Sequence, residues 1–383
     1  MSVTAAAGFS AGGTTAGLKP SGKPDLALVR NHGPRFDAAG VFTSNRVQAA
    51  PVQWSRQVLT DGRLRAVVLN SGGANACTGP DGFAVTHRTA EAVAEALGIG
   101  AIDVAVCSTG LIGVPLPVDK ITDALPALVA GAGADGGAAA AEAIMTTDTV
   151  SKQAVRHGDG WTVGGMAKGA AMLAPGLATM LVVITTDAVL DAPALHDHLA
   201  AACATTFERV DSDGCMSTND TVLLLSSGAS GTAPEPAGFR AALTAVCADL
   251  AGQLLADAEG AAHQIEIVVA GAASEQDAVT VGRSIARNNL FKCAVFGRDP
   301  NWGRVLAAIG TTDAVFEADQ LDVAFNGVQL CRAGSIGESR DLVDLTPAHV
   351  RVDVDLHAGG ASATVWTTDL TYDYVRENAE YST

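Results

Sequence analysis

Short apolar runs separated by turns rich in glycine, proline and aspartate make up most of the chain. Runs of β-branched residues predict strands, whereas apolar residues that recur at helical spacing predict helices. Strands are predicted at Asp25–Arg30, Ala39–Thr43, Leu64–Leu69, Ile102–Cys107, Thr179–Thr186, Thr221–Leu225, Gln264–Ala270, Val350–Leu356 and Ala361–Thr367, with a hairpin over Ala154–Met166. Helices are predicted at Thr86–Leu97, Pro117–Met145, Pro193–Phe207, Pro236–Glu259 and Ser274–Arg287.

The order of these elements predicts the fold class. Strands and helices come in blocks and not in strict strand–helix–strand alternation, which favours an α/β fold of the α+β type with sheets packed in layers. The predicted helix Pro117–Met145 is interrupted by the small residues of Ala130–Ala141, where we expect a helix–loop–helix at the surface.

One uncharged stretch, Gly169–Thr186, approaches the ~20 residues that span a bilayer. It contains Pro175 and Gly176 and ends in β-branched residues, so a turn leading into a buried strand fits better than a membrane span. The net charge of −17 argues against nucleic acid and anionic membranes as partners, because both select basic surfaces.

Composition indicates the kind of core, the state of the cysteines and the cellular location. Hydrophobic residues make up 48% of the chain but aromatic residues only 4%, so the core must be largely aliphatic. The seven cysteines form no CxxC pair, and we interpret them as reduced thiols with no metal site. The segment Met1–Gly13 lacks the basic and apolar regions of a secretory signal, so we expect a cytoplasmic protein.

Thr179 is a candidate nucleophile, because it opens the strongest predicted strand directly after a turn. A threonine hydroxyl needs an adjacent base, and a free α-amino group on the same residue, with an ordinary pKa of ~7.7–8.0, is such a base. Only a break of the Ala178–Thr179 bond would create that amine. The residues alone favour the simpler alternative, in which Thr179 is an ordinary strand residue.

A series of motifs favours the nucleophile over the ordinary strand residue as the interpretation of Thr179. The segment Lys168–Leu181 reads KGAAMLAPGLATML. Further motifs are GLK at Gly17–Lys19, DLAL at Asp25–Leu28, NSGGANACTG at Asn70–Gly79, STGLIG at Ser108–Gly113, MTTDT at Met145–Thr149, STNDT at Ser217–Thr221, AEGA at Ala258–Ala261 and DPNWGR at Asp299–Arg304. Through these motifs nearly the whole chain resembles the bifunctional ornithine acetyltransferases of arginine biosynthesis, also called glutamate N-acetyltransferases.

The resemblance implies a self-cleaving precursor with an N-terminal-nucleophile-like sandwich, in which helices lie outside stacked β-sheets. Thr179 would attack the carbonyl of Ala178, and hydrolysis would give two interlocked chains, an α chain (1–178) and a β chain (179–383). The new α-amine of Thr179 would then serve as general base. Acetyl would pass from N-acetylornithine to Thr179 and from there to glutamate.

The resemblance also implies roles for other residues. Thr109 and Gly110 would form the oxyanion hole, because a turn at a strand end can aim a hydroxyl and a backbone N–H at the developing negative charge. Lys168 would contact the substrate and lower the pKa of the Thr179 amine. The substrate-binding residues would be Thr146, Lys168, Thr179, Glu259, Asn378 and Thr383.

Some assignments stay open. Within MTTDT, Thr147 is an alternative to Thr146, although the spacing to Lys168 favours Thr146. The chain departs from the family pattern at Ala171, Gly176, Leu177 and Cys215. The changes at 171 and 176 could alter the cleavage rate, but neither removes a reacting group.

The resemblance implies no metal and no bound cofactor, and it suggests dimers of αβ units; acetyl-CoA is left open as a second acetyl donor. One alternative function is an N-terminal-nucleophile amidase or aminopeptidase that transfers the acyl group to water. Lys168 and Glu259 argue against it, because they suit charged amino-acid substrates. A non-catalytic binding protein is the other alternative, which the intact cleavage motif disfavours.

Overall fold

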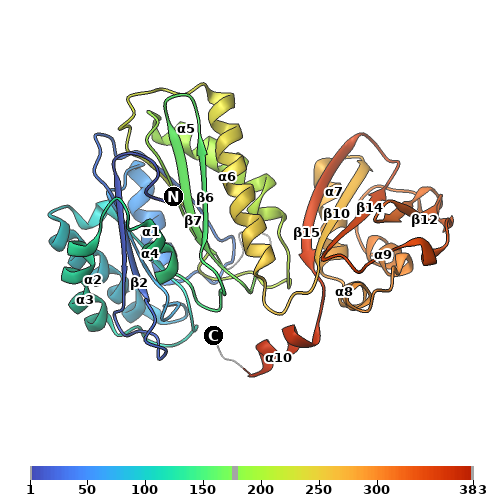
Figure 1. Ribbon diagram of the computed structural model, residues 1–383, viewed down its shortest axis with the longest axis horizontal. Helices are drawn as coiled ribbons and strands as arrows, with labels where there is room; N and C mark the ends of the chain where they lie inside the picture. The colour runs from blue at the N-terminus through green and yellow to red at the C-terminus, as the bar shows by residue number, and fades with distance from the viewer. Residues whose placement is uncertain (1, 175–179, 381–383) are drawn as a thin grey trace.

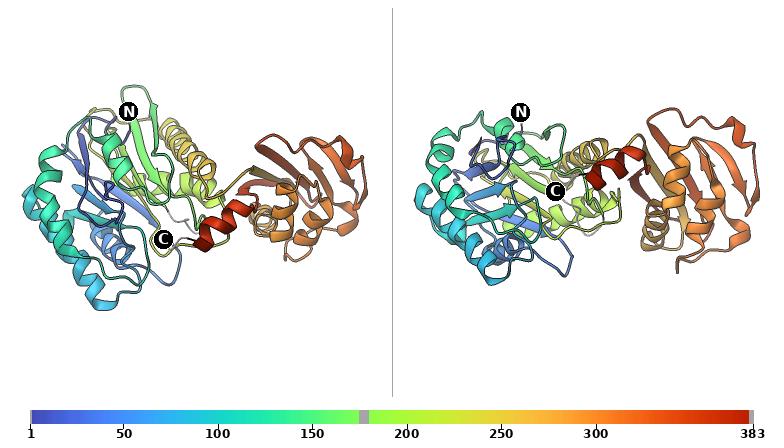
Figure 2. Two further views of the ribbon diagram at one scale, coloured as in Figure 1. Left: turned by 60° about the horizontal axis from the view of Figure 1, so that its bottom comes forward. Right: turned by 90° about the horizontal axis from the view of Figure 1, so that it is seen from below.

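A computed structural model describes residues 2–174 and 180–380 of the chain. The chain forms two lobes (Figure 1), the first containing the elements from β1 to α6 and the second those from β10 to β15. The last helix, α10 (Tyr372–Glu380), extends from the second lobe back toward the first (Figure 2).

The first sheet of the N-terminal lobe has the strand order β1–β2–β4–β5. Its strands are β1 (Phe9–Thr14), β2 (Leu26–Asn31), β4 (Ala66–Asn70) and β5 (Val104–Ser108). β4 and β5 are parallel with Asn70 paired to Ser108, so their carboxyl ends lie side by side.

The second sheet has the order β3–β9–β8–β7–β6. Its strands are β3 (Ala38–Phe42), β6 (Lys152–His157), β7 (Thr162–Lys168), β8 (Leu181–Thr186) and β9 (Thr221–Ser226). β8 is antiparallel to β7 and parallel to β9, which aligns Lys168, Leu181 and Thr221 in one row at the end of the sheet.

The two sheets stack face to face between layers of helices. Met166, Val183 and Leu223 of the second sheet belong to the core shared with the first sheet, whereas Ile184 and Leu224 belong to the core under the outer helices. The helices α1 (Ala50–Val58), α2 (Gly79–Leu97) and α3 (Val118–Gly131) flank the first sheet, and α5 (Ala192–Thr205) and α6 (Pro236–Ala256) flank the second. The predicted layered α/β fold, with helices outside stacked sheets, is confirmed.

The C-terminal lobe is built on a third sheet of order β13–β12–β11–β14–β10–β15. Its strands are β10 (Gln264–Ala272), β11 (Asp322–Phe325), β12 (Val328–Arg332), β13 (Ser335–Ile336), β14 (His349–Asp355) and β15 (Ala361–Thr368). The helices α7 (Glu275–Ala286), α8 (Asn289–Phe296) and α9 (Trp302–Ile309) complete its core.

The helix–loop–helix expected over Ala130–Ala141 is present, and many of its residues are exposed. One face of its second helix is buried, however: α4 (Gly137–Ala143) packs against β1 and β2, and Ala140 and Ala141 are fully buried. Small residues permit this close approach, because no space remains for a side chain at Gly13 beside Ala139.

One helix in the described part of the chain, α6, is long and apolar enough to cross a membrane by length and composition alone. It packs instead against β6, β7 and α5, as a core helix does. The stretch Gly169–Thr186, considered above as a membrane span, contributes the fully buried strand β8 to the second sheet.

Candidate active site

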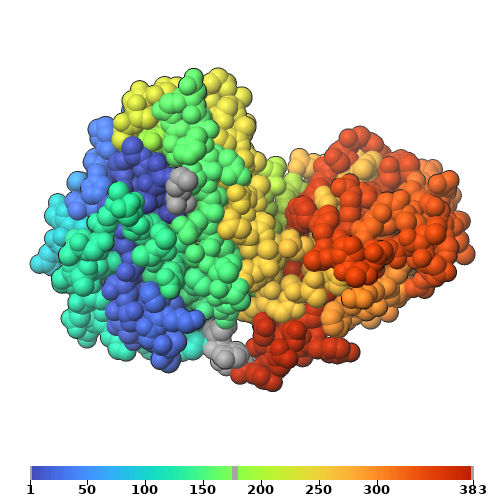
Figure 3. Space-filling view, viewed as in Figure 1, coloured from blue at the N-terminus to red at the C-terminus, as the bar shows by residue number. Residues whose placement is uncertain are grey.

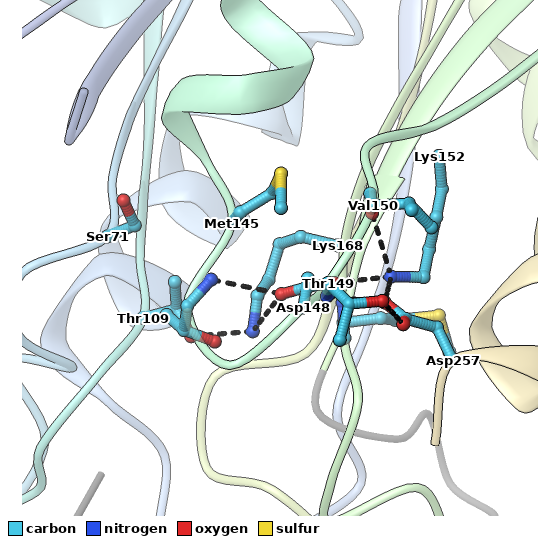
Figure 4. Close-up of polar contacts among 12 residues, drawn as sticks. Ser71, Thr109, Met145, Asp148, Thr149, Val150, Lys152, Lys168 and Asp257 are labelled. Atoms are coloured by element: carbon cyan, nitrogen blue, oxygen red, sulfur yellow. Dashed lines mark hydrogen bonds and ion pairs between the residues drawn. The ribbon is translucent and has the colours of Figure 1, made fainter. Parts of the chain in front are cut away.

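Residues from both stacked sheets meet where β5 and β7 end (Figure 4). Lys168, the last residue of β7, is buried and its Nζ donates a hydrogen bond of 3.4 Å to Oγ1 of Thr109, which follows β5. The structure therefore brings together two residues that the sequence places 59 positions apart.

Thr109 and Gly110 form a turn that the main chain fixes. The Thr109 N–H donates to the Asn70 carbonyl, and the Gly73 N–H donates to the Thr109 carbonyl, both at 3.0 Å. Gly110 has a φ of 129°, and a Cβ there would lie 2.7 Å from the Gly73 nitrogen, so only glycine fits. No described residue accepts the Gly110 N–H.

Asn219, from the segment before β9, holds this turn in place. Its buried Nδ2 donates to the carbonyls of Ala74 and Ser108, at 2.6 and 2.8 Å. The Ser108 hydroxyl in turn donates to Oδ1 of Asn70 at 2.5 Å. The NSGGANACTG, STGLIG and STNDT motifs thus form one hydrogen-bonded unit.

Asp148, from the MTTDT motif, is the buried anion beside Lys168. Its Oδ1 accepts hydrogen bonds from Lys152 Nζ at 2.7 Å and from the Gly169 N–H at 2.6 Å. Its Oδ2 accepts from the Thr146 N–H at 2.9 Å and lies 3.8 Å from Lys168 Nζ. Both oxygens of this carboxylate are therefore occupied.

The charge balance of this cluster extends to Asp257. Lys152 Nζ lies 2.6 Å from Asp257 Oδ2 and is fully buried between this carboxylate and Asp148. Thr149 also donates to Asp257, through both its N–H and its hydroxyl. Paired in this way, the buried charges avoid most of the cost of isolated ions.

The surroundings shift the pKa values of this cluster in a consistent direction. Burial alone would raise the pKa of Asp148, but the charges of Lys168 and Lys152 outweigh it and hold the pKa at about 2. Burial lowers the pKa of Lys168, although the nearby Asp148 opposes that shift. Asp148 is therefore ionised at neutral pH, and Lys168 gives up its proton more readily than an exposed lysine.

A cleft of about 1040 Å³ lies over this cluster and carries both signs of charge. Its lining includes Lys19, Lys23, Glu142, Met145, Thr146, Thr147, Asp148, Glu259, Glu377 and Asn378. Thr146 and Thr147 both reach the cleft, but only Thr146 is bonded to Asp148. Lys168 is not one of the lining residues: it has 1% of its surface exposed and reaches the lining residue Asp148 at 3.8 Å.

Lys19, from the GLK motif, is a cation of the cleft to which the sequence assigned no role. Its Nζ donates to the carbonyls of Pro24 and Met145, at 2.8 and 2.6 Å. Burial lowers the pKa of Lys19 to about 8.

The predicted ligands Glu259 and Asn378 meet at the cleft. Glu259 follows α6, and its Oε2 accepts a hydrogen bond of 3.1 Å from Nδ2 of Asn378 on α10. The space-filling view shows α10 at the lower edge of the molecule, across a hollow from the N-terminal lobe (Figure 3). The C-terminal helix therefore brings a side chain to a site built mainly by the first lobe.

Three predicted residues, Ala178, Thr179 and Thr383, lie outside the described residues. The described chain resumes at Met180, whose N–H donates to Oδ1 of the buried Asp220 at 3.1 Å. The sequence interpretation missed the roles of Asp148, Lys152, Asp257 and Asn219. Asp148 and Asn219 could have been found from the sequence, because they lie in the MTTDT and STNDT motifs. Lys152 and Asp257 lie in no such motif.

The profile of the ArgJ family matches residues 10–383. The chain belongs to the ArgJ family. The proteins named arginine biosynthesis bifunctional protein ArgJ from Streptomyces coelicolor and Thermobifida fusca are 65% and 63% identical to it, over 100% of both chains in each case. The protein of that name from Mycobacterium tuberculosis is 57% identical over 99% of this chain and 96% of its own.

Two solved structures are also similar to the chain. The ornithine acetyltransferase of Mycobacterium tuberculosis, complexed with ornithine, is 61% identical over 47% of this chain and 96% of that chain, with a TM-score of 0.45. The ArgJ protein of Bacillus halodurans is 36% identical over 51% of this chain and 97% of that chain, with a TM-score of 0.49. ArgJ membership, carried by the sequence relatives, makes the chain a bifunctional enzyme of arginine biosynthesis and an acyltransferase.

Proposed function

We propose that this ArgJ enzyme transfers an acetyl group from N-acetylornithine to glutamate through an acetyl-Thr179 intermediate. The observation that carries the proposal is the meeting of Lys168 with the Thr109–Gly110 turn beside Asp148, a residue that lines a cleft with both signs of charge. Such a cleft suits substrates that carry ammonium and carboxylate groups together.

The nucleophile of this proposal arises by self-cleavage between Ala178 and Thr179. The arrangement of the second sheet is compatible with such a cut, because β7 before it and β8 after it pair along Val163–Lys168 and Leu181–Thr186. The two resulting chains, 1–178 and 179–383, would stay together through this sheet and the shared core. Dimers of such αβ units belong to the same proposal.

In the transfer reaction, the α-amine of Thr179 accepts the proton of its own hydroxyl, and the oxygen attacks the acetyl carbonyl. The Gly110 N–H and the Thr109 hydroxyl stabilise the oxyanion, and one such donor is typically worth ~3–4 kcal/mol. Ornithine leaves with the proton from the amine. Glutamate then attacks acetyl-Thr179 by the same steps, which frees the hydroxyl and gives N-acetylglutamate.

Substrate recognition is assigned to the residues around the cleft. Glu259 pairs with an ammonium group of ornithine, and Asn378 orients that carboxylate through their hydrogen bond. Lys168 attracts the substrate carboxylate from below, and Thr146, bonded to Asp148, stands next to it. Thr383 is part of this assignment on the family resemblance alone.

The choice of acyl acceptor separates this proposal from an amidase. The acidic and basic groups of the cleft favour glutamate over water, because a charged acceptor gains ionic contacts that water lacks. The cleft is also larger than a single amino acid needs, which leaves acetyl-CoA open as a second donor.

The test is the intact mass of the denatured protein together with a transfer assay. We expect the natural chain to give two species, the second beginning at Thr179, and to convert N-acetylornithine and glutamate into ornithine and N-acetylglutamate. Thr179→Ala should remain one species near 38.6 kDa and be inactive, while Thr179→Ser should still cleave. An uncleaved natural chain with transfer activity would refute the proposed nucleophile, and release of acetate without a need for glutamate would favour the amidase.

A further inference from the structure

Lys19, on the loop between β1 and β2, is a cation of the cleft to which the proposed function gives no role. Its Nζ donates hydrogen bonds to the carbonyls of Pro24 and Met145, at 2.8 and 2.6 Å. The loop is itself held by the buried Asp25, whose carboxylate accepts three backbone N–H groups from residues 16–19, at 2.6 to 3.0 Å. Both the loop and the ammonium group of Lys19 are therefore fixed in place.

Lys19 differs from the other lysines of the site in its charge balance. Lys152 and Lys168 both face the carboxylate of Asp148. Within residues 2–174 and 180–380, no carboxylate pairs with Lys19, and both acceptors of its Nζ are neutral carbonyls. Burial lowers the pKa of Lys19 to about 8, and the charge of Asp25 only partly opposes that shift. A carboxylate bound beside Lys19 would therefore compensate its charge.

The two substrates of the proposed reaction differ in charge at the end of the side chain. The acetyl group is carried by the α-nitrogen in both N-acetylornithine and N-acetylglutamate, so both molecules present the same end to the nucleophile. The ornithine side chain ends in an ammonium group, whereas the glutamate side chain ends in a carboxylate. A cleft that serves both needs an anion for the donor and a cation for the acceptor.

The cleft offers two cations for this second task. Among the described lining residues they are Lys19 and Lys23. Lys168 is not part of the lining and already lies beside Asp148. Lys23 is exposed, and its Nζ donates to none of the described residues, so binding would have to immobilise it. The Lys19 side chain is already ordered by two hydrogen bonds and loses less freedom on binding.

We propose that Lys19 binds the side-chain carboxylate of glutamate and thereby selects the acetyl acceptor. This inference rests on the proposed function and adds a residue that distinguishes its two substrates. Lys19 is bonded to the carbonyl of Met145, and Met145 begins the segment that leads to Asp148 (Figure 4). The role is ionic, so no covalent bond forms or breaks at Lys19.

The main test is Lys19→Gln in the full chain, assayed by transfer from N-acetylornithine to glutamate. The new side chain keeps an N–H donor for the carbonyls of Pro24 and Met145 but has no charge. We expect KM for glutamate to rise ~10–100-fold, the usual range for losing a hydrogen bond to a charged group. KM for N-acetylornithine should stay within about twofold, as should the release of ornithine in a single turnover without glutamate.

The matched control is Lys120→Gln. Lys120 on α3 donates to the carbonyl of Gly17 on the same loop, at 2.6 Å, but it is exposed and is not one of the residues that line the cleft. Both KM values should stay within about twofold in this variant.

Three results would overturn the proposal. In a folded Lys19→Gln, an unchanged KM for glutamate would show that Lys19 does not bind the acceptor. Equal rises of KM for both substrates would show that Lys19 only supports the loop. A rise of KM for glutamate in Lys23→Gln but not in Lys19→Gln would assign the carboxylate to Lys23.

Free glutamine as the acceptor tests the same charge from the side of the substrate, because it replaces only the side-chain carboxylate by an amide. We expect the natural chain to prefer glutamate ~10–100-fold in kcat/KM, and Lys19→Met, which covers a misfolded Lys19→Gln, to lose most of this preference. A natural chain that acetylates both acceptors equally well would overturn the proposal without any variant. Release of acetate with no need for either acceptor would instead refute the proposed function, which keeps the two failures apart.

Discussion

At the scale of single residues, the site depends on how each buried charge is compensated. Asp148 faces Lys152 and Lys168, and Lys152 is shared with Asp257. Removing one partner leaves another charge buried and uncompensated, which typically costs ~3–5 kcal/mol. The cluster is therefore both part of the site and a structural support of the strand ends that form it.

This compensation predicts a pH dependence of stability. The pKa of Asp148 lies at about 2, below its ordinary value of 3.8, so its contribution is complete above pH 3.8 and is lost as the pH falls toward 2. We expect Asp148→Asn to lower the free energy of unfolding by ~3–5 kcal/mol at pH 7.

Urea unfolding between pH 7 and pH 2 provides the measurement. The stability gap between the natural chain and Asp148→Asn should narrow by ~2 kcal/mol from pH 4 to pH 2, since each pKa unit is worth about 1.4 kcal/mol. Asp123→Asn, at an exposed position of α3, is the control and should change little. A stability difference between the two proteins that stays constant from pH 4 to pH 2 would show that Asp148 ionisation does not stabilise the fold.

At the scale of elements, the turn after β5 is fixed by close backbone packing in addition to the Asn219 side chain. Gly110 lies against the Gly73 backbone, so the turn packs directly on the glycine-rich turn after β4. The parallel pairing of β4 and β5 places both turns at one edge.

The close approach at Gly110 predicts the effect of adding one methyl group. Gly110→Ala should displace the turn and lower kcat for acetyl transfer by ~10²–10³-fold, the usual loss when one oxyanion donor is removed. Gly113→Ala is the matched control, because Gly113 also has a positive φ, of 79°, but nothing lies within 4 Å of a Cβ there. Its kcat should stay within about threefold. Equal losses in both variants would indicate general backbone strain instead.

At the scale of the whole molecule, the second lobe contributes through α10. This helix has no buried residues, yet it carries Asn378 to the cleft of the first lobe. An element with so little buried surface adds little to stability, so we expect variants of α10 to affect ligand binding more than folding.

Two α10 variants test whether the helix affects ligand binding. Asn378→Ala removes the hydrogen bond to Glu259, so we expect KM for N-acetylornithine to rise ~10-fold with kcat nearly unchanged, a loss of ~1.4 kcal/mol. Arg376→Ala removes only an exposed pair with Asp373, 2.8 Å away, and should leave both constants unchanged. An unchanged KM in Asn378→Ala would remove α10 from the binding site.

The sequence predicted elements best where periodicity was strong. The alternation over Gln264–Ala270 corresponds to β10, in which Ile265, Ile267 and Val269 are buried. The short helices α8 and α9 and the strands β1 and β11–β13 were not predicted, because their few apolar positions do not establish a period. The buried face of α4 was missed for another reason: small residues serve equally in a surface loop and in a close helix–sheet contact.

By itself, the sequence determined the family, the layered fold class and the motifs that hold the candidate chemistry, because these depend on residue types and spacing along the chain. Only the tertiary structure decided that Asp148 compensates Lys168 and that Asn219 holds the turn after β5. The burial of a charged side chain and the identity of its neighbours depend on the packing of strand ends that are distant in the sequence. A local sequence pattern therefore cannot predict them.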